Sequence, residues 1–174
     1  MIQEFQLEYL IPILKGALFT ILLCLSSSFI GGIIGVIIGL GMLAKNKFIR
    51  KISSLYVQIV RGVPLLMLIF LIYFALPLIH PIFSTTATFS AVLSLSIYAA
   101  AYLAEIVRGS IQSIDKGQFE AADALGFSYW QKTRLVIFPQ AFKYMIPPGI
   151  GFIIMLVKDS SLVSIIGFVD LARA

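Results

Sequence analysis

The sequence predicts an all-α integral membrane protein, built as a multi-span helical bundle with one polar loop. Of the 174 residues, 60% are hydrophobic and only 12% are charged, and the mean hydropathy is +1.02. A soluble domain carries about 25% charged residues, so that class is excluded. Disorder is excluded because the chain is too apolar. A helix needs about 20 residues to cross a bilayer, which leaves room for four or five spans.

Apolar segments predict four spans within a single transmembrane domain over residues 1–174, at about 16–44, 56–76, 89–107 and 144–169. In the first, Gly31, Gly35 and Gly39 recur at four-residue spacing, which predicts a flat strip for close helix packing. The second and third are separated by a stretch that contains Pro77 and Pro81. Near the start of the fourth span come two further prolines, Pro147 and Pro148, where missing backbone donors cost least.

The basic residues predict the orientation. They cluster in residues 45–51 and 108–143, whereas the stretch around His80 has neither lysine nor arginine. Both basic loops should therefore face the cytoplasm, with the N-terminus and the His80 loop outside. Residues 2–10 are expected at the outer interface, and their acidic, arginine-free start is not a signal peptide. With one cysteine and one histidine, the chain offers no metal cluster, so no metal is expected.

The polar loop at about 115–139 reads as two short helices around a glycine. Asp115 could cap the first helix with Gln118 reaching back to it, and Gly126 would end that helix. Residues 128–131 read as a second capping box, and Pro139 would end the second helix.

The first of these helices has features that suit a partner. Ala121 and Ala122 are small enough to seat closely in a groove, while Glu120 and Asp123 share a face suited to basic groups. An ordinary surface loop is the alternative.

A resemblance bears on that choice. Glu120-Ala121-Ala122, Gly126 four positions after Ala122, and the V-I-F-P ending at Pro139 resemble the EAA loop of ATP-binding-cassette importer permeases. The family ends this loop with I-x-L-P. Residues 61–66 (RGVPLL), 104–109 (AEIVRG) and 158–162 (KDSSL) are similar to segments of the polar amino-acid branch, with Val63 in place of threonine.

The resemblance implies a transmembrane subunit of the bacterial inner membrane that forms half of a translocation pathway. It implies a homo- or heterodimer with a second permease, an extracytoplasmic amino-acid-binding protein, and separate ATPase subunits that use ATP and magnesium. The ATPase-coupling residues would be Glu120, Ala121, Ala122, Asp123, Gly126 and Pro139. The family usually has five spans, and four are predicted here. The chain has no G-x-x-x-x-G-K-[ST] loop, so it is not expected to be the enzyme. Membrane lipid is the expected surrounding, and no role in nucleic-acid binding is implied.

Two charges, Lys158 and Asp159, lie near the middle of the fourth predicted span. Intramembrane charges usually face a partner or a wet cavity, so these residues, with Ser160 and Ser161 of the similar segment, are candidate solute contacts. Glu105 is a candidate partner for Lys158. A structural charge network between the spans is one alternative, and a local Glu105–Arg108 ion pair is another.

Rival functions are also open from the sequence. An ion-coupled secondary transporter would use Glu105 and Asp159 to carry protons or sodium. A membrane scaffold or enzyme would show no solute-dependent effect. Within the family, an importer permease for an osmolyte is the alternative to a polar amino acid.

Overall fold

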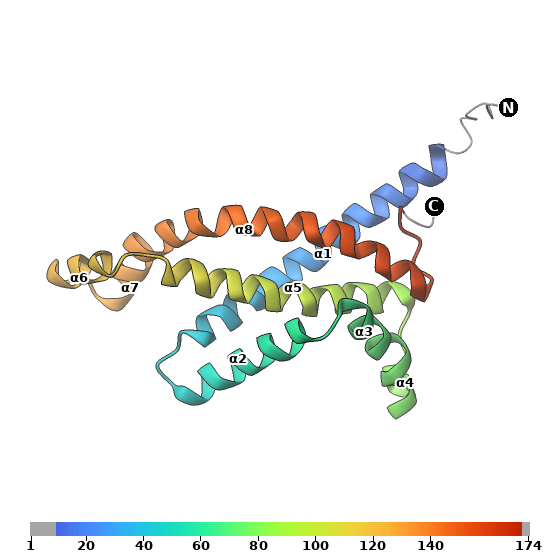
Figure 1. Ribbon diagram of the computed structural model, residues 1–174, viewed down its shortest axis with the longest axis horizontal. Helices are drawn as coiled ribbons and strands as arrows, with labels where there is room; N and C mark the ends of the chain where they lie inside the picture. The colour runs from blue at the N-terminus through green and yellow to red at the C-terminus, as the bar shows by residue number, and fades with distance from the viewer. Residues whose placement is uncertain (1–9, 172–174) are drawn as a thin grey trace.

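The computed structural model describes residues 10–171, and within them every regular element is helical, which confirms the predicted all-α class. Four helices dominate: α1 (Leu10–Met42), α2 (Lys47–Gly62), α5 (Ala87–Gln112) and α8 (Phe138–Asp159). Figure 1 shows α1, α5 and α8 running along the length of the molecule. Shorter elements join them: α3 (Leu65–Phe70), η2 (Leu71–Ala75), α4 (Leu76–Ile79), η3 (Pro81–Phe83), α6 (Lys116–Ala124), α7 (Tyr129–Gln131), η4 (Lys132–Ile137) and η5 (Ser160–Ile166).

The glycine strip of α1 packs directly on α5. Gly31, Gly35 and Gly39 are all buried. A Cβ atom added at Gly35 would lie 2.9 Å from Leu103 Cβ and 3.0 Å from the Ala100 carbonyl oxygen, closer than real side chains approach. The packing role predicted for these glycines is therefore confirmed: a missing side chain lets the two backbones meet.

The main core gathers around α5. Leu95 of α5 is fully buried, with Ile69 of α3, Leu156 of α8 and Val163 of η5. These residues come from four elements far apart in the chain, so α5 is the helix against which the others are placed.

The second predicted span, 56–76, is not one straight helix. Helix α2 ends at Gly62, Val63 and Pro64 are extended, and the helix that resumes at Leu65 is bent by 102° from α2. The helix breaks here because proline disfavours helical geometry in the residue before it, which is Val63. The bent pair can still form one broken span, and the prediction of a span at 56–76 stays a prediction. Three other helices are long and apolar enough to cross a membrane: 10–42, 87–112 and the combined 129–166.

The sequence predicts that Pro139 ends a short helix of the polar loop and that Pro147 and Pro148 lie near the start of the fourth span, but none of them interrupts the last long helix, α8. Pro139 lies in its first α-helical turn, and Pro147 and Pro148 lie inside α8. The segment η4 just before Pro139 is π-helical, and the Phe138 N–H donates to the Thr133 carbonyl. The same wider turn precedes Pro77, where the Leu76 N–H donates to the Leu71 carbonyl. A π turn shifts the carbonyls that a proline ring would otherwise meet, so the helix continues.

The two basic loops lie at the same end of the molecule. In Figure 1 the turn between α1 and α2 and the α6–α7 loop are both at the left, while α4 and the start of α1 are at the right. His80 directly follows α4 and makes local contacts: its Nδ1 accepts from the Ile82 N–H at 3.2 Å, and its ring lies edge-on to Phe83. The predicted interfacial segment 2–10 lies outside the described residues except for Leu10.

Replacing Gly35 by valine should destabilise the α1–α5 contact. Overpacking costs about 1–3 kcal/mol, so the melting temperature of the solubilised protein should fall by about 5 °C or more. The control is Gly32→Val, one position along α1, where an added Cβ meets only Leu103 Cδ1 at 3.9 Å. Size-exclusion chromatography after heating measures both variants. An equal fall in melting temperature in both variants would show that close packing at Gly35 does not stabilise the α1–α5 contact.

Candidate functional site

The polar loop folds as the helix–glycine–helix unit predicted for it. Asp115 caps α6 by accepting from the Gly117 N–H at 2.6 Å. The expected contact of Gln118 with the cap is wrong: its Oε1 instead accepts from Gln140 Nε2 at 3.0 Å. That bond joins the start of α6 to the first turns of α8, so the loop is braced by its own chain.

Gly126 ends α6 in the left-handed conformation, with φ at +71°. Its N–H donates to the Asp123 carbonyl at 3.0 Å, and the Phe127 N–H donates to the Ala122 carbonyl at 3.1 Å. This bond pair is a Schellman motif, which favours glycine at that position. Both hydrogen bonds of the predicted capping box between Ser128 and Gln131 are also present.

The exposed face of α6 differs from the predicted one. Ala122 is 2% exposed and so is covered within this chain, where the sequence had placed it against a partner. Asp123 forms an ion pair with Lys132 at 2.6 Å, which links α6 to η4. Glu120 and Ala121 are exposed. A short helix must bury one face on its own loop, so only the opposite face is left for another protein.

Asp159 is the last residue of α8, half-buried beside α5. Lys158 and Asp159, predicted near the middle of the fourth span, lie where the α-helix ends and a 3₁₀-helix begins at Ser160. The Tyr98 hydroxyl donates to Asp159 Oδ2 at 3.3 Å. Among residues 10–171, no cationic nitrogen lies within 4.0 Å of this carboxylate.

The neighbours of Asp159 are placed differently from one another. Lys158 and Ser161 are exposed, while Ser160 is 1% exposed and donates its hydroxyl to the Val157 carbonyl at 2.8 Å. Successive residues of a helix point roughly 100° apart, so Lys158 can face outward while Asp159 faces α5. The structure thus places Asp159 toward α5 and Lys158 away from the core.

Aromatic rings extend from Asp159 along α5. The rings of Tyr98 and Tyr102 are 4.6 Å apart, and Tyr102 stacks on Phe152 of α8 at 5.6 Å. On this cluster lies the guanidinium of Arg61, 4.9 Å from the centre of the Tyr102 ring. One carboxylate and one guanidinium therefore flank a pair of tyrosines.

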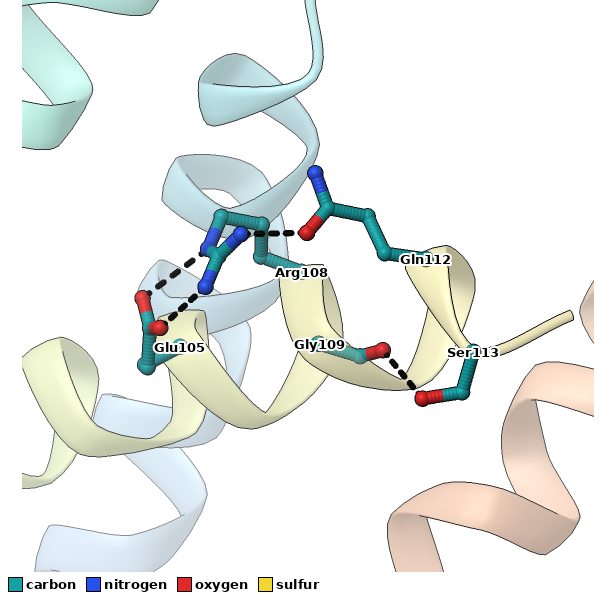
Figure 2. A network of polar contacts seen from close by, with 5 residues as sticks. All are labelled: Glu105, Arg108, Gly109, Gln112 and Ser113. Carbon is teal, nitrogen blue, oxygen red and sulfur yellow. Dashed lines mark hydrogen bonds and ion pairs between the residues drawn. The ribbon is translucent and has the colours of Figure 1, made fainter.

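Glu105 does not join Lys158, so that predicted partnership is wrong. Arg108 holds the carboxylate instead, with its Nε 3.1 Å from Glu105 Oε2 and a second contact from its Nη2 to Oε1. Figure 2 shows the Arg108 guanidinium between Glu105 and Gln112 on one side of α5. Glu105 lies seven residues after Tyr98 on α5, which is about two helical turns away from the tyrosine that contacts Asp159. The local ion pair was the alternative that the sequence left open.

Comparison with known proteins decides the family. Residues 31–173 match the family described as "Binding-protein-dependent transport system inner membrane component". The chain belongs to this family. It is 40% identical to the "Probable amino-acid ABC transporter permease protein YckA" of Bacillus subtilis, over 92% of this chain and 70% of that protein. It is 37% identical to the "Arginine transport system permease protein ArtQ" of the same organism, over 92% and 73%.

A solved structure supports the same assignment. The "Crystal structure of an amino acid ABC transporter with histidines" includes a chain that superposes with a TM-score of 0.88 at 37% identity, covering 95% of this chain and 77% of that chain. As a permease of this family, the protein is an inner-membrane transport subunit that works with an ABC ATPase. The alternatives of a secondary transporter and of a membrane scaffold are thereby set aside.

Sequence reasoning did not single out Tyr98 and Tyr102 of this permease, or the contact that Arg61 makes. A signal for the tyrosines was present: positions 98, 102 and 105 fall on one helical face of an otherwise uncharged span. No sequence signal places Arg61 on Tyr102, because that contact depends on how α2 crosses α5.

Proposed function

We propose that this permease moves polar amino acids, as half of the translocation pathway of an ATP-driven importer. The observation that carries the proposal is the family match over residues 31–173 together with relatives named amino-acid permeases. In this proposal a second permease, identical or related, completes the pathway. An extracytoplasmic binding protein delivers the amino acid. ATP and magnesium bind the ATPase subunits, and this chain carries out no hydrolysis.

Asp159 is the proposed anchor for the amino acid. Its carboxylate is half-buried and has the Tyr98 hydroxyl as its hydrogen-bond partner, with no cation near it in the described part of the chain. Burying an unpaired carboxylate within a membrane costs free energy unless a cation binds to it. The ammonium group of an amino acid is such a cation. Lys158, Ser160 and Ser161 are proposed to assist at the same place. Glu105 is a weaker candidate because Arg108 occupies it.

An osmolyte remains the second candidate, since tyrosine rings beside a carboxylate also suit a quaternary ammonium group. The ring geometry favours the amino acid. Tyr98 and Tyr102 lie against each other, and Tyr102 stacks on Phe152, so these rings cover one another instead of forming an open cage.

The proposed orientation has the N-terminus and the His80 loop outside. In spheroplasts, His80→Cys should react with a membrane-impermeant maleimide, whereas Lys47→Cys should react only after permeabilisation, because both basic loops face the cytoplasm. Both variants are made with Cys24→Ala, which removes the single native cysteine. The opposite labelling pattern would refute this orientation.

Asp159→Asn should lower uptake about tenfold or more, since it removes the charge that holds the ammonium while keeping the side chain's shape. Uptake of labelled amino acids is measured in proteoliposomes that contain the ATPase and the binding protein. Asp115→Asn is the matched control, because asparagine caps a helix as well as aspartate. If Asp159→Asn and Lys158→Met both transport normally, the solute site lies elsewhere.

The exposed face of α6 is proposed to dock in the ATPase, so Ala121→Trp should uncouple hydrolysis from transport. Loaded binding protein should no longer stimulate ATP hydrolysis, and uptake should stop, while the helices still insert. Ala121→Ser keeps the side chain small and should behave as the wild type. Gly126→Val should have the same effect as Ala121→Trp, because a side chain at φ +71° is strained by about 1 kcal/mol or more. Full stimulation in both bulky variants would exclude this loop as the coupling element.

A further inference from the structure

A polar cavity lies apart from Asp159, where the end of α1 meets α2 and the last turns of α5. Its volume is about 410 Å³. Three arginines line it, Arg50, Arg61 and Arg108, against the single carboxylate of Glu105. Of the residues proposed to contact the solute, Glu105 is the one that lines this cavity, so the three arginines of the cavity need a separate explanation.

Two of the three arginines have no carboxylate partner among residues 10–171. Arg108 forms an ion pair with the Glu105 carboxylate, as Figure 2 shows. Arg50 and Arg61 have no carboxylate oxygen within 4.0 Å in the part of the chain that the structure describes. Arg50 donates only to the Ala44 carbonyl at 3.4 Å, and Arg61 rests on the Tyr102 ring. Two guanidinium groups thus remain available to an anion.

The lining of the cavity suits a phosphate. Gln58, Ser54 and Gln112 add polar side chains to the arginines. A guanidinium offers a planar fork of donors that matches phosphate oxygens, and amides and hydroxyls can fill the remaining acceptor positions. Arg50 and Arg61 are eleven residues apart on α2, which is about three helical turns, so both lie on the face of the helix that lines the cavity.

The position of the cavity favours a lipid over a free anion. It lies at the end of the molecule that carries the basic loops, where anionic headgroups attract arginine and lysine. The opposite face of α2 exposes Phe48, Ile52, Leu55 and Ile59. Helix α2 thus has an apolar face, which suits lipid acyl chains, and a polar face that lines the cavity.

We propose that this cavity binds the phosphate headgroup of an anionic glycerophospholipid, held by Arg50 and Arg61 beside the Glu105–Arg108 ion pair. The bound lipid joins α2 to α5 at the cytoplasmic end of the permease. This site rests on the family assignment and is independent of which solute is transported.

The test measures lipid binding to the purified permease–ATPase complex by native mass spectrometry. Dioleoylphosphatidylglycerol should bind more tightly than dioleoylphosphatidylcholine. Arg50→Gln and Arg61→Gln should each weaken phosphatidylglycerol binding about fivefold. Lys51→Gln removes the same charge from the neighbouring position of α2, outside the cavity lining, and should have little effect. Arg61→Lys, which keeps the charge without the fork, should bind at an intermediate level if the protein is intact.

Three results would overturn the proposal. Equal losses in Lys51→Gln and Arg50→Gln would indicate attraction by the basic surface as a whole. Unchanged binding in both arginine variants would place the lipid elsewhere. Displacement of phosphatidylglycerol by millimolar inorganic phosphate or glycerol 3-phosphate would identify a free anion as the occupant. Loss of transport in Asp159→Asn bears on the solute site alone, so failure of either proposal leaves the other standing.

Discussion

The close approach of α1 and α5 is the contact on which the rest of the structure depends. Gly35 has no side chain, and the Ala100 backbone lies where one would be. Once α1 is seated there, one side of α5 is fixed, and α5 offers its other sides to α2, α3 and α8. A membrane provides no hydrophobic force between helices, so close packing of small residues supplies the attraction.

Helix α5 also carries both polar sites, at different depths. Tyr98 contacts Asp159, Tyr102 supports Arg61, and two turns further on Glu105 and Arg108 form their ion pair. The order along one helix keeps the carboxylate proposed for solute binding away from the arginines proposed for lipid. Charges that would otherwise neutralise each other therefore stay separate.

The polar loop at 115–139, proposed as the coupling element, lies between α5 and α8, since α5 leads into α6 and η4 leads into α8. Its bracing is internal: Gln118 bonds to Gln140, and Asp123 pairs with Lys132. A loop held by its own contacts moves as one piece. In the proposed coupling, a push from the ATPase on the exposed face of α6 would be passed to α8, whose far end carries Asp159.

The sequence by itself determined the membrane class, the capping of α6 and α7, the Gly126 turn and the glycine strip, because each depends on composition or on residues close together in the chain. Tertiary structure decided the rest. Pro139 follows a π turn that lets the helix continue, and Pro147 and Pro148 lie inside the same helix α8 despite their local preference. Ala122 is covered by its own loop, and Glu105 pairs with Arg108 instead of Lys158. The pairing of charged side chains depends on how helices that are distant in the sequence pack against one another. A local sequence pattern carries no information about that packing.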